Sequence, residues 1–236
     1  MKLSRRPQVL GVTLGVAALL APPAARADVT DAPAPATARR SPMAASRGLQ
    51  LGVRAAYAVP AGRVSASGAS LSDLETATIP IGIEAGYRIS PRLYVGGTAV
   101  WGPGTGPAAG PCTVAGVSCF RQDAQARGEA RFYFAPEAKV GGWLAVGAGW
   151  ELATFAQSAG GSAVTATRSG PVLADMQFGV DVRRGPTAVA LYAGVSFAMF
   201  LTQGLSPSTS PVSPWIEDRS AHAWMTVGLR GSYGPW

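Results

Sequence analysis

Strict alternation between apolar residues and small or charged ones is the feature of this chain that most constrains its fold. The alternation is clearest from Ile79 to Trp101, IPIGIEAGYRISPRLYVGGTAVW, where one parity carries branched or aromatic side chains and the other carries mainly glycine and charges. A period of two is typical of a β-strand, because successive side chains point to opposite faces. Ser90, Pro91 and Arg92 interrupt the pattern and supply a turn. We therefore expect a tight hairpin with one apolar face.

The same alternation returns along most of the chain. The expected strands are residues 49–59, 79–89, 93–101, 124–134, 144–152, 172–181, 189–199 and 221–233. Their connections are alternately long and short, and the long ones are residues 60–78, 102–123, 156–170 and 202–219. Eight strands of about 10 residues fit the even-numbered barrels that cross a bilayer with strands. The sequence predicts an all-β fold: a transmembrane up-and-down antiparallel β-barrel of eight strands.

Composition favours a lipid-facing barrel over a water-soluble one. Only 14% of the residues are charged, against roughly 25% in soluble domains. In a soluble secreted barrel the same apolar parity would line a cavity, and this is the alternative fold. The apolar parity of the sixth expected strand begins with Val172, Ala174 and Met176.

The polar parity of the strands carries balanced charge. Its charged members are Arg54, Arg88, Arg127, Arg131 and Arg230 together with Glu84, Glu129, Glu151, Asp175 and Asp181. Unpaired buried charge is costly, so equal numbers of both signs suit an ion-paired interior in which each acid is matched by an arginine. The expected strands hold no Lys, and arginine forms planar, multidentate pairs. We expect these residues to form a charge network inside the barrel, sharing the space with Tyr94, Tyr133, Tyr192 and Trp224.

The amino terminus has the pattern of an export signal. Lys2, Arg5 and Arg6 precede an apolar run over residues 9–21, and a small-x-small cleavage pattern ends at Ala27. The run is shorter than the roughly 20 residues that a transmembrane helix needs. The expected segments are a signal peptide at residues 1–27, a disordered periplasmic lead-in at residues 28–47 and the barrel at residues 48–236.

The basic charge of the chain is concentrated in the expected signal peptide. The formal net charge is +7, and residues 1–27 hold four basic residues and no acid, so 7 − 4 = +3 is left without them. No basic patch is left that would suit a polyanion. We do not expect a nucleic-acid partner.

The two cysteines fall in the second long connection. Cys112 and Cys119 are the only cysteines, and a close pair in an exported protein predicts a disulfide. Closing a loop of this size contributes about 2.5 kcal/mol in the chain-entropy model, enough to stiffen a loop. One histidine and two cysteines do not make a metal site, and no cofactor is expected.

Catalysis has little support in the sequence. His222 is the only histidine, and it begins the last expected strand on the polar parity, where a hydrogen bond at the rim is the simpler role. Ser220 lies two residues away, an arrangement that echoes lipid-modifying hydrolases among outer-membrane barrels. This gives an enzyme as a minor alternative.

The strand count, the alternation of loops, the export signal and the aromatic carboxyl end resemble the small eight-stranded outer-membrane proteins of Gram-negative bacteria, the OmpA-type and OmpW-type barrels. The resemblance covers residues 48–233. It implies a location in the bacterial outer membrane, contact with membrane lipid and lipopolysaccharide, and recognition by the barrel-assembly machinery through an aromatic strand end. Trp236 is terminal, but Pro235 interrupts a regular strand, so Tyr233 is the alternative strand end.

The function expected from this resemblance is structural or recognitional. The chain would be a monomeric, non-enzymatic barrel that acts through four extracellular loops. The alternative is a narrow pore or a conduit for small hydrophobic compounds. An open porin is not expected, because an eight-stranded lumen is only wide enough for side chains.

Overall fold

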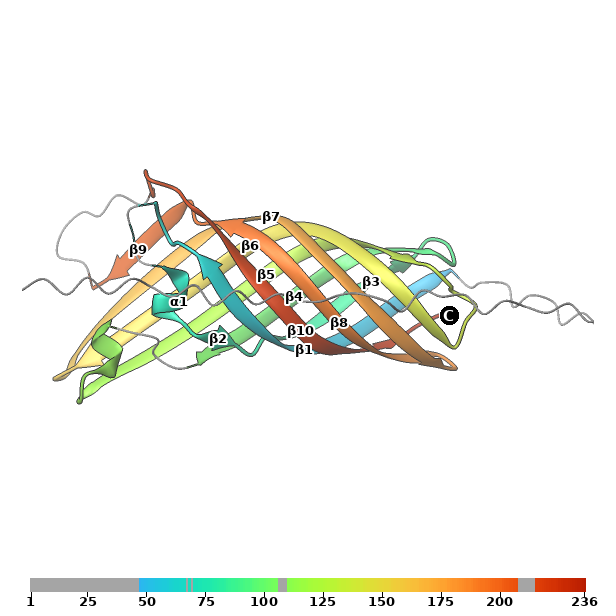
Figure 1. The fold of residues 1–236 in the computed structure, drawn as a ribbon, viewed down its shortest axis with the longest axis horizontal. Coiled ribbons are helices and arrows are strands. Elements are labelled where there is room, and N and C mark those ends of the chain that lie inside the picture. The colour runs from blue at the N-terminus through green and yellow to red at the C-terminus, as the bar shows by residue number, and fades with distance from the viewer. Residues whose placement is uncertain (1–46, 67, 69, 106–109, 208–214) are drawn as a thin grey trace, which may run out of the picture. The chain divides into compact units, whose positions relative to one another are not determined.

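The computed structural model describes residues 47–66, 68, 70–105, 110–207 and 215–236 (Figure 1). The predicted signal peptide and, apart from Arg47, the predicted lead-in lie outside these residues. Within them, no helix is long and apolar enough to cross a membrane.

Eight long antiparallel strands form a closed ring. They are β1 (Gly48–Gly62), β3 (Ile81–Arg88), β4 (Leu93–Thr105), β5 (Val117–Tyr133), β6 (Val140–Ala159), β7 (Ser162–Arg184), β8 (Thr187–Met199) and β10 (Ala221–Tyr233). Neighbours in this order are hydrogen-bonded, and β10 returns to β1 over the register from Leu51↔Tyr233 to Gly62↔His222. Shorter elements are α1 (Leu71–Leu74), β2 (Ala77–Thr78), the 3₁₀ helix η1 (Gly110–Thr113) and β9 (Thr202–Ser206). The predicted fold class is confirmed.

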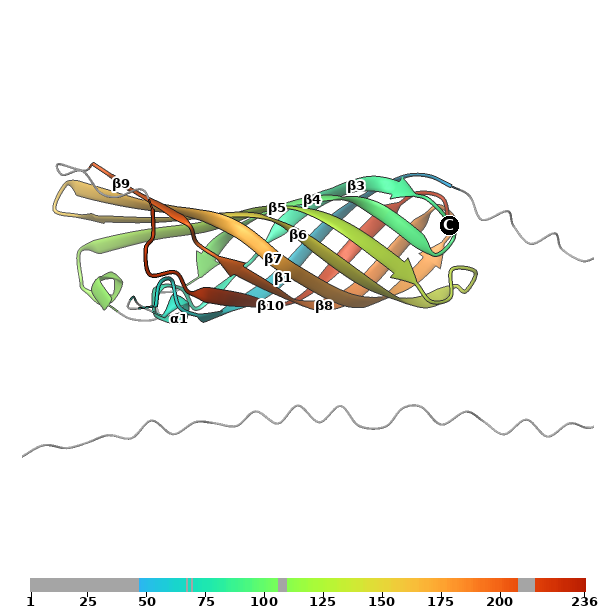
Figure 2. The ribbon, with the colours of Figure 1, turned by 90° about the horizontal axis from the view of Figure 1, so that it is seen from above.

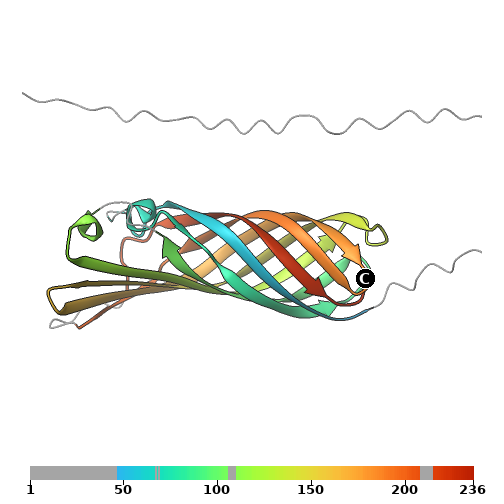
Figure 3. The ribbon, with the colours of Figure 1, turned by 90° about the horizontal axis from the view of Figure 1, so that it is seen from below.

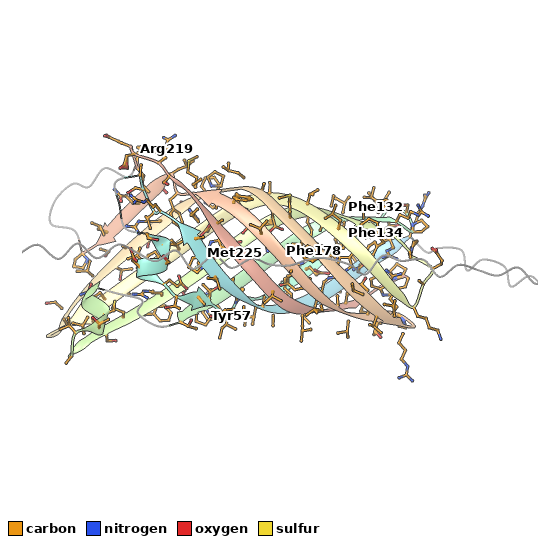
Figure 4. The ribbon with its side chains drawn as sticks, in the orientation of Figure 1. Tyr57, Phe132, Phe134, Phe178, Arg219 and Met225 are labelled. Carbon is orange, nitrogen blue, oxygen red and sulfur yellow. A yellow bond between two sulfur atoms is a disulfide. The ribbon has the colours of Figure 1, made fainter. Side chains whose placement is uncertain are left out.

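The two parities of the strands face opposite sides of the wall. Large apolar side chains lie outside, with Ile83 65%, Phe178 64% and Leu191 62% exposed, whereas Arg131 and Tyr94 are fully buried inside. Figure 4 shows Phe178 and Met225 directed away from the barrel. An apolar exterior around a charged interior is the arrangement that lipid requires. The alternative of a soluble barrel with its apolar face inside is therefore wrong.

The two ends of the barrel differ in their connections. The turns β3–β4, β5–β6 and β7–β8 are short and lie at the end where β1 begins and β10 ends. We call this the inner end, because short turns face the periplasm in such barrels, and we call the opposite end the outer end. Phe132 and Phe134 lie near the inner end (Figure 4), with ring centroids 5.7 Å apart. Aromatic rings at this level suit a membrane interface.

Two of the predicted long connections contain long pieces of strand. β5 begins at Val117 rather than near residue 124, and β6 and β7 continue to a two-residue turn at Gly160 and Gly161, whose φ angles are +56° and +83°. Figures 2 and 3 show β5, β6 and β7 extending beyond the other strands at the outer end. The extension of β6 and β7 was missed because its Ser, Thr, Ala and Gly residues carry no clear apolar parity. A strand that lies beyond the bilayer has no side facing lipid, so its sequence needs no alternation of apolar residues.

The predicted face of Val172 is wrong. The register of β7 shifts between Val172 and Ala174 against β8, and Val172 is buried inside while Leu173 is exposed outside. A β-bulge adds one residue to a strand and so reverses the parity beyond it. The alternation after the bulge was read correctly, the part of β7 before residue 171 was expected to be a loop, and the shift itself leaves no mark in the pattern.

Candidate functional site: the barrel interior and its outer plug

The inner half of the barrel interior is filled by a group of ion pairs centred on Glu84. Arg54 donates to Glu84 at 2.6 Å and to Glu129 at 3.3 Å. Arg131 contacts the same two carboxylates, at 3.2 Å for Glu84. Arg230 donates through Nε to Glu84 at 2.6 Å. We call these five residues the inner network; they come from four strands and tie the wall together across the lumen.

Arg88 and Arg183 lie at the inner mouth beside aromatic rings. Arg88 packs 4.2 Å from the ring centre of Tyr133 and 4.3 Å from that of Trp236, and Arg183 lies 4.9 Å from the ring of Trp236. Among the described residues no ion pair joins Arg88 to a carboxylate, so the expected ion pairing is wrong for Arg88. Arg183, which the sequence reasoning passed over, contacts Asp181 at 3.6 Å.

The carboxyl end of the chain folds over this mouth. β10 ends at the exposed Tyr233, and Trp236 donates its Nε1–H to the carbonyl of Pro186 at 3.2 Å. The structure thus makes Tyr233 the strand end, as the alternative expectation had it. Trp236 contributes to the packing of the inner mouth.

A second ion pair lies closer to the outer end of the barrel. Arg127 contacts Asp175 at 2.6 Å. Gln177 connects this pair to the inner network, because it accepts from Arg54 at 3.2 Å and donates to Asp175 at 2.5 Å. These side chains border a small cavity of about 30 Å³, which is the size of a water site rather than of a channel.

Glu151 is paired differently from the prediction. Its carboxylate is hydrogen-bonded to His222 at 3.0 Å and accepts from the Nε1–H of Trp224 at 3.1 Å. His222 is buried rather than at an open rim, and its ring stacks on Phe200 with centroids 4.4 Å apart. The expectation that an arginine matches every acid is therefore wrong for Glu151. The register that brings β6 opposite β10 across the lumen could not be read from either strand alone.

The outer end is closed by the first long loop. We call residues 70–78 the outer plug. Leu71 and Ala77 are fully buried, and Leu71 belongs to an apolar cluster that includes Phe200, Ile216 and Trp224. Thr105 donates to the carbonyl of Ala77 at 3.0 Å. The plug is thus packed into the mouth, not spread over the surface as a free loop.

Glu75 is the charged residue that the plug carries into the barrel. Its side chain is buried, and a Cβ on Gly104 would clash with its Oε1 and with the Cβ of Arg121, so the missing side chain of Gly104 leaves room for the carboxylate. Burial is the main cause that raises the pKa of Glu75 to about 7; the nearby carboxylate of Asp123 raises it further, and Arg121 opposes the rise. The plug therefore docks most favourably when Glu75 is protonated.

Formal charge is unevenly distributed along the interior. The inner half holds Arg54, Arg88, Arg131, Arg183 and Arg230 against Glu84, Glu129 and Asp181. The outer half holds Arg121 and Arg127 against Glu75, Asp123, Glu151 and Asp175. Formally, the inner half is 5 − 3 = +2 and the outer half 2 − 4 = −2. Asp123 and Arg121 continue the polar parity of Arg127, and that signal was overlooked because a loop was expected there.

The disulfide predicted between Cys112 and Cys119 is present, with Cα atoms 5.8 Å apart. Cys119 lies within β5, paired with Gln157 of β6, rather than in a loop. The bond therefore fastens η1 to the part of β5 that extends beyond the barrel.

The interior has the chemistry of a packed, ion-paired core. Ser220, the candidate nucleophile, bonds weakly to the carbonyl of Ala221 at 3.5 Å, and in the described part of the chain no hydrogen bond joins it to His222. His222 itself is buried beneath the apolar cluster of the outer plug. The closed ring, apolar wall and charged lumen are those of a barrel built for lipid. This is the architecture of a small bacterial outer-membrane barrel.

Comparisons with known proteins give only distant likenesses. No family model and no curated protein sequence matches the chain. Neisserial surface protein A is 19% identical over 81% of this chain and 99% of its own, with a TM-score of 0.46. Ail, the attachment invasion locus protein of Yersinia pestis, is 11% identical over 79% and 99%, with a TM-score of 0.47. The outer membrane protease OmpT of Escherichia coli is 7% identical over 80% and 95%, with a TM-score of 0.41. Such distant likenesses transfer no residue roles.

Proposed function

We propose that this protein is a non-conducting barrel of the outer membrane that acts as a structural or surface-recognition element through its outer loops, without catalysing a reaction. The apolar wall suits a bilayer, and single-chain bacterial barrels of this kind reside in the outer membrane. The observation that carries the proposal is the filled lumen. Arg131, Glu84 and Tyr94 are buried in the inner half of the barrel, and the outer plug adds a second closure at the outer end.

The extended sheet supports recognition as the role of the outer end. β9 adds to β7 over Thr165–Ser169, so β5, β6, β7 and β9 form a sheet that continues beyond the membrane-facing wall. Such a sheet presents a rigid surface, and the disulfide fixes its border at β5. We also propose that the barrel-assembly machinery inserts the chain and that the extended sheet binds a surface ligand.

Conductance tests the closed lumen. The exported protein, purified and reconstituted in planar bilayers, should give little or no sustained current. A variant whose plug residues 70–76 are replaced by a Gly-Ser linker should also stay closed, because the inner network still fills the barrel. Stable, ion-selective currents in the wild type that disappear when Arg131 or Glu129 is replaced would favour a narrow pore instead.

A further inference from the structure

The outer wall carries a shallow apolar groove across β6, β7, β8, β10 and β1. Its volume is about 560 Å³, and its lining includes Tyr57, Val59, Phe178, Ala193, Met225 and Val227. Ala193 is small, whereas the residues on either side are large, so the wall is hollowed there. Figure 4 shows Tyr57, Phe178 and Met225 on this part of the exterior. We call this feature the seam groove, because it crosses the junction of the first and last strands.

A lane of alanines leads from the seam groove towards the outer end. Ala61 pairs directly with Ala223 across the β1–β10 junction, and Ala221 is the next outward-facing residue of β10. On β1 the outward parity passes from Val59 to Ala61. The methyl side chains of alanine project little from the wall. An acyl chain that lies in the seam groove can therefore extend along the wall towards the outer end.

Two arginines stand at the end of this lane. Arg63 follows β1 directly, and Arg219 is bridged to Ser65. Both are exposed, and in the described residues neither forms an ion pair with a carboxylate. Each is steadied by a backbone carbonyl: Arg63 donates to Ala66 at 3.1 Å, and Arg219 donates to Ile216 at 3.3 Å. Figure 4 shows Arg219 beyond Met225 at the outer end.

The spacing fits a membrane interface. Arg63 lies four residues beyond Val59, about 13 Å along a strand at roughly 3.3 Å per residue. With a strand tilt of about 40°, this is about 10 Å along the membrane normal. The headgroup region adds about 5–8 Å on each side of the hydrocarbon core, so flexible arginine side chains can reach it from there. Guanidinium groups bind phosphate through paired hydrogen bonds.

We propose that the seam groove, the alanine lane and the two arginines bind one phosphate-bearing lipid of the outer leaflet, with an acyl chain in the groove and a phosphate at Arg63 and Arg219. This inference rests on the membrane location in the proposed function and deepens it by naming a lipid class and its site. The exposed Glu217 lies two residues from Arg219 and opposes an anion there. Its removal should therefore strengthen binding.

Native mass spectrometry of the exported protein released from nanodiscs tests the proposal. The nanodiscs contain phosphatidylcholine with lipid A, or with dephosphorylated lipid A. The wild type should retain one lipid A at least tenfold more often than either phosphatidylcholine or dephosphorylated lipid A. Arg63→Gln combined with Arg219→Gln, and separately Ala193→Trp, should abolish this preference. Glu217→Gln should increase it.

Arg92→Gln combined with Arg184→Gln is the matched control, because both arginines are exposed at the inner end. This variant should retain lipid A like the wild type. Equal retention by the Arg63/Arg219 double variant, or equal retention of phosphatidylcholine, would refute the site. Dimers that Ala193→Trp dissociates and the arginine variants leave intact would also refute it, and would assign the groove to a second copy. Each variant is checked for heat-modifiable gel mobility, so a failed membrane barrel is distinguished from a failed lipid site.

Discussion

At the scale of single residues, three arginines of the inner network share one carboxylate. Glu84 meets Arg54, Arg131 and Arg230, so removing one arginine changes the balance around a carboxylate that water does not reach. The usual result of deleting one partner of a buried pair is far larger than the net gain from forming it. The network is thus more sensitive to loss of a member than its contribution to stability would suggest.

Arg131→Ala should lower the free energy of unfolding by about 3 kcal/mol, because Glu129 and Glu84 lose a buried partner. Urea titrations in liposomes measure this. Arg184→Ala is the control, since Arg184 is exposed at the β7–β8 turn and should stay within about 0.5 kcal/mol of the wild type. Wild-type stability for both variants would contradict the assignment of Arg131 to the interior.

Glu75 predicts a pH dependence of the outer plug. Its pKa is raised from about 4.5 to about 7 in the docked plug, so docking is strongest below about 4.5, weakens as the pH rises to about 7, and changes no further above that. Hydrogen exchange of the amides of residues 71–79, corrected for intrinsic rates, should show less protection at pH 8 than at pH 5. Glu75→Gln should remove most of the difference. If amide protection in this variant depends on pH as in the wild type, the titrating group is Asp123 and not Glu75.

At the scale of elements, the disulfide stiffens an extension that the barrel does not need. Cys112→Ser combined with Cys119→Ser removes a cross-link worth about 2.5 kcal/mol in the chain-entropy model, but only from η1 and the outer part of β5. Membrane insertion should be unchanged, and protease cleavage near residues 110–121 should become faster. Free thiols in the oxidised exported protein, or loss of insertion in the variant, would contradict this.

Element positions were readable from the sequence where lipid imposes a pattern. Arg54, Glu84 and Tyr94 face inward as expected, because parity depends only on the geometry of one strand. Partners were not readable: Arg54 and Gln177 are 123 residues apart, and their meeting depends on register around the whole ring. The bulge at Val172 and the folding of Glu75 into the mouth likewise result from contacts between elements.

At the scale of the whole molecule, the outer surface of the strands faces lipid along the barrel wall and water along the extension beyond it. Val146 on β6 and Val164 on β7 are about equally exposed, at 51% and 49%, but Val146 lies on the lipid-facing wall and Val164 on the extension beyond it. Val146→Arg should therefore cost about 2–4 kcal/mol in urea titrations, as a charge placed in lipid does. Val164→Arg should cost about 0.5 kcal/mol or less, because its side chain meets water. Similar losses in both variants would contradict the placement of the bilayer.

The junction of β1 with β10 also fixes the order of events during biogenesis. β1 and β10 are the first and last strands of the ring, so the pairing of Leu51 with Tyr233 forms only when the last strand has folded. Until then the folding barrel is an open curved sheet with two unsatisfied edges, each able to recruit a foreign strand. Completion is therefore a single late event, and a chain stopped anywhere before Ala221 cannot close into this ring.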